Sequence, residues 1–245
     1  ANQIAVAFDM GTQEAGEFLA KTKAQLNLGT KELFAYADTI NYLSDNTASK
    51  AEEITEISQR VASLGGIAGV SKESVAAFGA TLISAGVAPE RASTGLKNLY
   101  VDLSKGTSAT KGAREAFKNL GLSAEQLAVD MQKNGEGTIL KVLSKIKQMP
   151  KELQTATINQ IFGQEAIDSV SGLVNNLDML ETNLKKSKSA MANGAVEAEY
   201  KNRMNTLTTQ LKVFKNQLMN SFADLGLALA PSIRQVLKEM TPMIH

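Results

Sequence analysis

The sequence predicts an all-α protein, with a compact multi-helix domain of short capped helices followed by a long amphipathic, coiled-coil-like C-terminal helix. Three observations predict this class. Large apolar residues recur at spacings of three and four along most of the chain, which is the period of a helix with one buried face. The 18 glycines fall mainly where these patterns stop, and only 4 prolines occur. With no Trp and few other aromatic residues, the core is expected to consist of Leu, Ile, Val, Ala and Met, which suits helix-on-helix packing.

The first predicted segment, residues 1–68, is expected to hold the N-terminal helices. Ile4, Val6 and Phe8 alternate as in a strand, but no partner strand is predicted elsewhere. We therefore interpret residues 1–10 as the tail of a helix. Three further helices are predicted, each beginning at a hydroxyl residue that can cap it: Thr12 to Leu26, Thr30 to Leu43 and Ser49 to Leu64.

The run Gly65-Gly66-Ile67-Ala68-Gly69 has two interpretations. Paired glycines are flexible, so the run is interpreted as a hinge, and a phosphate-binding loop is the alternative. The Walker and Rossmann loops both require a preceding buried strand, and the Walker loop also ends in Gly-Lys-Ser/Thr. The sequence has neither feature, so the hinge is favoured.

The second predicted segment, residues 69–188, is expected to be a compact multi-helix core. Ser71 is placed to cap a helix that ends at Gly86, where a glycine can adopt the left-handed conformation. Val87 can then fold back onto Leu82, as in a Schellman closure. Further helices are predicted from Pro89 to near Gly106, from Ala113 to Leu120, from Ser123 to near Asn134, from Thr138 to Ile146, from Pro150 to Gly163 and from Ile167 to Val174.

Two short runs in this segment are interpreted as exposed. Asn134-Gly135-Glu136-Gly137 is expected to form an exposed turn and a flexible tip, because Asn and Gly favour turns. Lys185-Lys186-Ser187-Lys188 changes the composition after a leucine-rich helical face, and we interpret it as a solvated helix end at a domain boundary. A basic cluster this small is more typical of a solvated surface than of a nucleic-acid binding site.

The sequence of residues 69–90 resembles the conserved core of phage tail tape measure proteins. The same likeness continues in Ala92-Ser93-Thr94-Gly95-Leu96-Lys97-Asn98-Leu99, Gly121-Leu122-Ser123-Ala124-Glu125-Gln126-Leu127, Asn41-Tyr42-Leu43-Ser44, Ile161-Phe162-Gly163 and Leu173-Val174-Asn175-Asn176-Leu177. No single piece is diagnostic, but the ordered series over roughly residues 1–185 is typical of the family.

The resemblance implies a structural protein that sits inside the phage tail and sets its length during assembly. It further implies that the protein recruits tail-tube subunits together with tail assembly chaperones, and that it leaves the tail ahead of the DNA at infection. The implied location is the lumen of the tail tube in the virion, after assembly in the host cytoplasm. The alternative is a helical protein-interaction or membrane-active module unrelated to tails.

The third predicted segment, residues 189–245, is expected to hold a long interaction helix and a tail. Its large apolar residues step by four and three, which is the coiled-coil alternation, with one stutter before Phe222. We predict that they bind a second copy of the chain or another helix, so that the protein is a homo-oligomer; packing back onto the core is the alternative. The predicted contact residues are Tyr200, Met204, Leu207, Leu211, Phe214, Leu218, Phe222 and Leu225.

Charge and composition limit the kinds of partner and site that the chain can have. The net charge of +1 is too small to favour nucleic acid or a membrane surface, although residues 1–60 carry a net charge of −4 and residues 181–245 a net charge of +4. The absence of Cys excludes disulfides and thiolate metal sites within the chain. No apolar run is long enough for a transmembrane helix. Because the first residue is Ala, we expect the chain to be a piece of a longer protein.

The residues do not predict an enzyme. With His245 as the one histidine and no Cys, neither a Ser-His or Cys-His pair nor a histidine metal site can be assembled in the body of the chain. Glu52, Glu53 and Glu56 share one helix, but glutamates on an acidic helix face are usually solvated. We therefore expect no catalytic residues, no metal and no cofactor.

Overall fold

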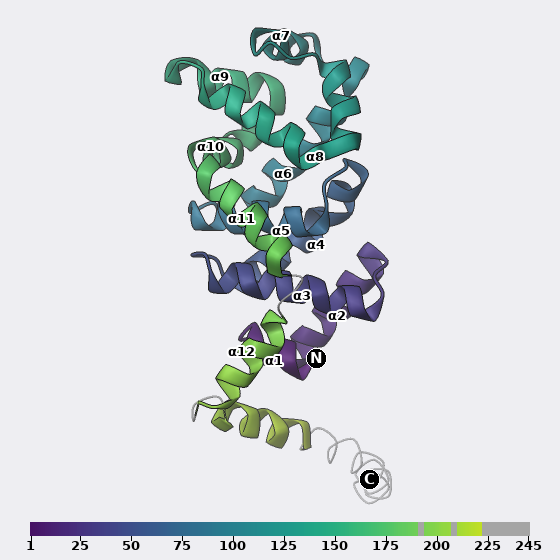
Figure 1. Cartoon of the computed structure of the whole chain (residues 1–245), viewed down its shortest axis with the longest axis vertical. Coiled ribbons are helices and arrows are strands. Elements are labelled where there is room, and N and C mark those ends of the chain that lie inside the picture. Colours follow the sequence, from purple (N-terminus) through teal and green to yellow (C-terminus); the bar gives the residue numbers. More distant parts are fainter. Residues whose placement is uncertain (191–193, 207–209, 222–245) are drawn as a thin grey trace, which may run out of the picture. The chain divides into compact units, whose positions relative to one another are not determined.

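The computed structural model describes residues 1–190, 194–206 and 210–221, and every regular element within these ranges is a helix (Figure 1). The all-α prediction is confirmed. The N-terminal elements are α1 (Asn2–Ala7), α2 (Thr12–Leu26), α3 (Thr30–Asp45), α4 (Ala51–Ile67), α5 (Lys72–Ser84), α6 (Pro89–Ser104) and the 3₁₀ turn η1 (Gly106–Ser108). These are followed by α7 (Lys111–Asn119), α8 (Ala124–Lys147), α9 (Lys151–Phe162), the 3₁₀ turn η2 (Gln164–Ala166), α10 (Ile167–Asn175), α11 (Leu177–Ala190) and α12 (Ala195–Met204).

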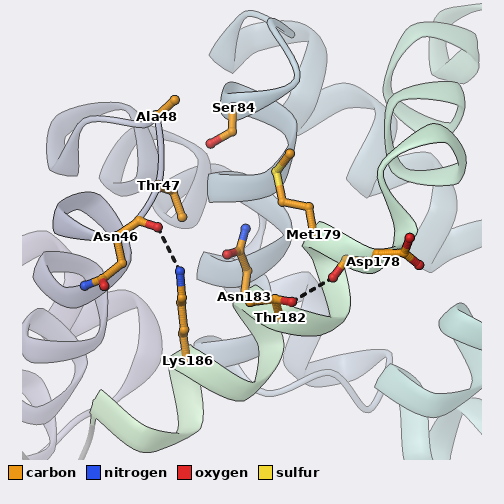
Figure 2. A pocket seen from close by; sticks show the side chains of 9 residues that line it. All are labelled: Asn46, Thr47, Ala48, Ser84, Asp178, Met179, Thr182, Asn183 and Lys186. Carbon is orange, nitrogen blue, oxygen red and sulfur yellow. Dashed lines mark hydrogen bonds between the residues drawn. The ribbon is translucent and has the colours of Figure 1, made fainter.

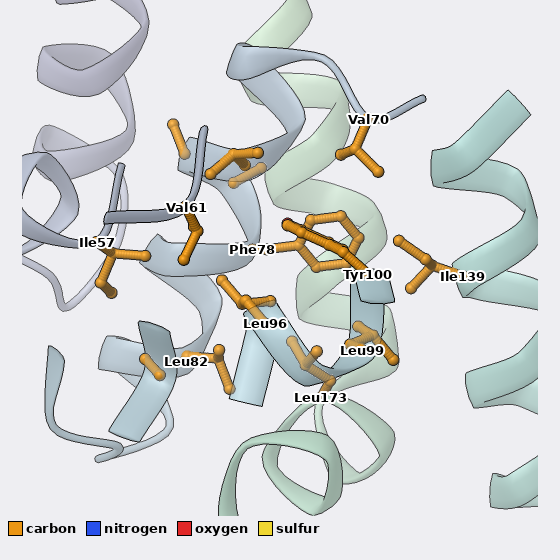
Figure 3. Packing of buried hydrophobic residues seen from close by; sticks show 14 of the residues in the cluster. Ile57, Val61, Val70, Phe78, Leu82, Leu96, Leu99, Tyr100, Ile139 and Leu173 are labelled. Atoms are coloured by element: carbon orange, nitrogen blue, oxygen red, sulfur yellow. The ribbon is translucent and has the colours of Figure 1, made fainter. Parts of the chain in front are cut away.

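Residues 1–198 form one compact unit, and a second unit begins at Glu199. The first unit is built around α5, in which every residue from Glu73 to Leu82 is buried. The helices α3, α4, α6, α10 and α11 all pack against it. In the core beside α5, the rings of Phe78 and Tyr100 meet edge to face, with centroids 6.3 Å apart (Figure 3).

Local end signals act as predicted at α5, and α7 ends in the same way. The Ser71 hydroxyl accepts a hydrogen bond from the Ser74 N–H at 3.1 Å, which caps α5. At the other end, Gly86 has a φ of +83°, and the Val87 N–H donates to the Leu82 carbonyl at 3.0 Å. This is the closure of a Schellman motif. The same bond, from the Leu122 N–H to the Phe117 carbonyl at 2.9 Å, ends α7.

The N-terminal helices begin by a different device from the one predicted. The cap positions of α2, α3 and α4 are held by Gly11, Gly29 and Lys50, and no side chain of theirs caps the helix. Instead, a glutamate three positions later accepts a hydrogen bond from each cap N–H: Glu14 at 3.4 Å, Glu32 at 2.8 Å and Glu53 at 2.9 Å. A carboxylate in the first turn also interacts favourably with the helix dipole.

The glycine pair predicted as a hinge lies inside α4, which continues to Ile67. A Cβ on Gly65 would lie 2.7 Å from the Val75 Cγ2 atom, so this glycine permits α4 and α5 to approach closely. Gly66 has open space around its Cα. Gly65 therefore serves helix packing, and because both glycines are helical the hinge interpretation of the pair is wrong.

The run predicted as an exposed flexible tip is a bend inside α8. Asn134 has non-helical angles (φ −157°, ψ 78°), and its Oδ1 atom accepts the Gly137 N–H at 3.0 Å, so it caps the second half of the helix. Gly135 is buried, and its N–H donates to the Gly69 carbonyl at 3.2 Å. The prediction failed because it considered only local turn preference, whereas this bend is held by a contact with a distant turn.

The basic run at residues 185–188 also differs in part from its interpretation. It lies inside α11, which packs against α3 and α5, and Ser187 within it is fully buried. Lys188 lies in the last turn of α11 and is exposed, as interpreted, but the buried Ser187 shows that the run is only partly solvated. The predicted segment boundaries at residues 68 and 188 stay a prediction about which pieces fold independently.

Candidate interaction surface

The helix formed by residues 210–221 presents large apolar side chains to solvent. Leu211 and Phe214 are each 61% exposed, Leu218 is 38% exposed and Met219 is 62% exposed. Leu211, Phe214 and Leu218 follow at spacings of three and four, so they lie on one face of this helix. A row of exposed large apolar side chains is typical of an interaction surface. We call Leu211, Phe214 and Leu218 the apolar stripe; Met219 is exposed beside it.

The remaining predicted contact residues divide between α12 and the undescribed positions. Tyr200 and Met204 are half-buried in α12, whereas Leu207, Phe222 and Leu225 lie outside the described residues. The unbroken helix predicted for this segment is not shown, because α12 ends at Met204 and a turn follows. The structure therefore brings only part of the predicted set onto one helix face.

The turn after α12 has a local cause. The Thr206 hydroxyl donates to the Arg203 carbonyl at 2.8 Å, and the Thr206 N–H donates to the same carbonyl at 3.1 Å instead of continuing the helical pattern. Asn and Thr side chains bond readily to nearby backbone, which competes with helix propagation. The heptad spacing did not reveal this interruption, because it counts only the apolar positions.

The start of α12 is fixed by a side chain from α3. The Val196 N–H donates to the Asp38 Oδ1 atom at 2.8 Å, and Val196 itself is buried. Gly194 precedes the helix and has no side chain with which to cap it. Asp38 therefore acts as an N-cap supplied from 158 residues away in the sequence.

Burial raises the pKa of Asp38 above its usual value of 3.8, with the Glu197 carboxylate adding to the rise and the Val196 hydrogen bond opposing it. The folded chain therefore binds this proton more tightly than the unfolded chain does, and ionised Asp38 reduces stability at neutral pH. We expect Asp38→Asn, which keeps an oxygen acceptor, to raise the melting temperature at pH ~7. The gain should shrink as the pH falls through the raised pKa. Thermal unfolding of the wild type and the variant, from neutral pH down into acid, measures the difference in melting temperature. A difference that persists in acid would contradict the raised pKa of Asp38.

A depression of about 430 Å³ lies in the compact unit between the α3–α4 turn, the end of α5 and α11 (Figure 2). The Lys186 ammonium group crosses one side of it and donates to the Asn46 carbonyl at 2.9 Å. Hydroxyl and amide groups make up most of the polar lining. The lining residues are Asn46, Thr47, Ala48, Ser84, Asp178, Met179, Thr182, Asn183 and Lys186. These residues do not include a histidine or another base beside a nucleophile.

Two of the three carboxylates of α4 have structural partners. Glu53 accepts the N–H at the start of its own helix, and Glu56 pairs with Arg60 at 2.6 Å. Within the part of the chain that the structure describes, no group of three or more His, Cys, Asp or Glu side chains could hold a metal ion. Across residues 1–190, 194–206 and 210–221, no helix has both the length and the apolar character that crossing a bilayer requires.

Comparison with known proteins identifies the class. A family model described as phage-related minor tail protein matches residues 1–163, which is more than half of the chain. The chain belongs to this family and is a phage tail protein, as the resemblance of residues 69–90 predicted.

A particular relative is the probable tape measure protein of Halomonas phage phiHAP-1, which is 30% identical to this chain over 242 residues. The alignment covers 98% of this chain and 28% of the relative, so the chain spans less than a third of that protein's length. No solved structure matches the chain. The family match ends just after α9, so the apolar stripe lies outside it.

Proposed function

We propose that this chain is part of a tape measure protein, which scaffolds polymerisation of the tail tube and sets the length of the tail. The observation that carries the proposal is the alignment with a probable tape measure protein over 98% of this chain. The helical architecture supports it, because helices offer extended contact faces and a defined rise per residue. Family membership does not favour the alternative of a module unrelated to tails.

The compact unit is proposed to supply assembly contacts more than length. A continuous helix of 245 residues would reach about 370 Å at a rise of ~1.5 Å per residue. A compact chain of this size has a radius of gyration of only about 18 Å. Folded as one unit, residues 1–198 therefore add little to the length of a ruler. A cryo-microscopy map of the tail showing a contiguous rod through residues 70–175 would contradict this part of the proposal.

The proposed partners follow from the stripe and from the family. The exposed face at Leu211, Phe214 and Leu218 is proposed to pair with a second copy of the chain, extended by Tyr200 and Met204 and by the undescribed Leu207, Phe222 and Leu225. The tail-tube protein and tail assembly chaperones are the further proposed partners. The proposed location is the lumen of the tail tube in the virion, after assembly in the host cytoplasm.

An in-frame deletion in the phage that encodes this chain tests the length-setting role. Removing the 23 residues 199–221 should shorten the tail by about 35 Å if they lie along its axis as helix. The matched control replaces Leu211, Phe214 and Leu218 with glutamine at full length and should leave the length of assembled tails unchanged. Electron microscopy of the virions measures both. Deletion tails of normal length would refute a length-setting role for this segment.

A further inference from the structure

The helix α11 is attached to the compact unit by a buried face that is partly polar. Leu180 and Leu184 are buried on it, but so are Asn183 and Ser187, which are 1% and 0% exposed. The Asn183 amide donates to the Thr81 hydroxyl of α5 at 2.9 Å, and both groups are buried. A buried polar pair of this kind fixes the register of two helices but contributes less to stability than an apolar pair of the same size.

The C-terminal end of α11 is held by a network centred on Glu136. The Lys188 ammonium group bonds to the Glu136 Oε1 atom at 2.8 Å, while the Ser74 hydroxyl donates to Oε2 at 2.6 Å. Glu136 is the residue that follows Asn134 and Gly135 in the bend of α8. One carboxylate therefore joins α5, α8 and α11, which are far apart in the sequence.

Further polar contacts continue along α3. The Thr39 hydroxyl donates to the Ser187 carbonyl at 3.4 Å, and Lys186 donates to the Asn46 carbonyl at the C-terminal end of α3 (Figure 2). Beyond α11, the chain is held again where Asp38 accepts the Val196 N–H at 2.8 Å. The points of attachment from residue 183 to residue 196 are thus two buried apolar side chains, Leu184 and Val196, together with hydrogen bonds and the Lys188–Glu136 ion pair.

We propose that α11 together with residues 194–198 forms a strap that opens from the compact unit as one piece while the other helices stay folded. Besides its buried Leu177, Leu180 and Leu184, α11 buries two polar side chains, and helices with a partly polar buried face open locally at lower free energy than those with a wholly apolar one. The helix α6 differs from α11 in this respect, because the large side chains on its buried face are Leu96, Leu99, Tyr100 and Leu103. Opening would let the chain from Leu177 onward extend by about 1.5 Å per helical residue. The proposal concerns the compact unit alone and does not depend on a role in setting tail length.

Hydrogen exchange with mass spectrometry on the whole chain tests the strap. In the wild type, amides of α11 should exchange faster than those of α4 and α6. Combining Glu136→Gln with Asp38→Ala should accelerate exchange in the strap by roughly tenfold or more, with α4 and α6 unchanged. Equal acceleration in all helices, or none in the strap, would overturn the proposal.

Two control variants separate the fastening role from general damage. Asp38→Asn keeps the acceptor for the Val196 N–H and removes a buried carboxylate, so it should not accelerate exchange in the strap. Asp168→Asn breaks a 2.8 Å ion pair to Arg91 between α10 and α6, outside the strap, and should leave exchange in the strap unchanged. The proposal would be contradicted if either control variant accelerated exchange in the strap as much as the double variant Glu136→Gln, Asp38→Ala does.

A covalent lock gives an independent readout. The chain has no Cys, so Thr81→Cys with Asn183→Cys provides a single thiol pair at a point where the native side chains are in contact. Oxidation should slow exchange of α11 toward the rate of α4, and reduction should restore it. If α11 exchanges at the same rate in the oxidised and the reduced protein, the strap does not open at this contact.

Discussion

Replacing Gly69 with alanine is expected to lower the free energy of unfolding by about 3 kcal/mol or more. Gly69 has a φ of +76°, a conformation that costs an L-residue about 1 kcal/mol. A Cβ at this position would lie 2.1 Å from the Met131 carbonyl oxygen and 3.0 Å from its carbonyl carbon. Because these atoms belong to the backbone of α8, relief requires the helix to move. The Gly135 hydrogen bond to the Gly69 carbonyl would be lost with that movement.

The matched control for this prediction lies three residues earlier. Gly66 is helical, and a Cβ added to it would have no packing neighbour within 4 Å, so Gly66→Ala should stabilise the protein by about 0.5–1 kcal/mol. Urea unfolding followed by circular dichroism measures both variants. Equal stability of the two would show that the contact between the Gly69 turn and α8 is not rigid.

Substituting Leu211, Phe214 and Leu218 together with glutamine should weaken self-association by roughly 100-fold or more. Burying a large apolar side chain contributes about 1.5–3 kcal/mol, and all three are exposed in the single chain, so pairing would bury them. Sedimentation velocity over a range of concentrations gives the dissociation constant. The compact unit should retain its melting temperature, because the substitutions lie beyond residue 198.

The control for the stripe uses polar residues on the same helix. Asn216 and Asn220 are exposed and lie away from the Leu211–Phe214–Leu218 face, so replacing both with serine should leave self-association unchanged. A wild-type chain that remains monomeric at every concentration would exclude the second copy as the partner. Identical sedimentation of the glutamine variant and the wild type would exclude the stripe as the contact.

Much of the fold was predictable because its signals are local. The Ser71 cap, the closure at Gly86 and the proline that begins α6 each depend on residues within one or two turns of each other. The apolar spacing then assigned the buried faces of most helices. The apolar stripe was predictable for the same reason, since its spacing lies within twelve consecutive residues.

The parts that sequence reasoning missed depend on contacts between distant residues. Asn134 and Gly135 have the composition of an exposed turn, and Asn134 is exposed, but only the position of Gly69 makes Gly135 part of a buried bend. Asp38 lies in mid-helix with no motif around it, yet it caps a helix that begins more than 150 residues later. Neither pairing has a local pattern, so neither could be derived from a single sequence.

The complete enclosure of α5 imposes an order on mechanical unravelling. Tension applied from the C-terminal side of residue 198 would first load α11 and then α10, both of which cover α5. Because α5 is covered on all its faces, it cannot be pulled out while the neighbouring helices remain packed against it. Pulled from that end, the molecule should come apart in steps from the outside inward, with α5 resisting until its C-terminal neighbours have gone.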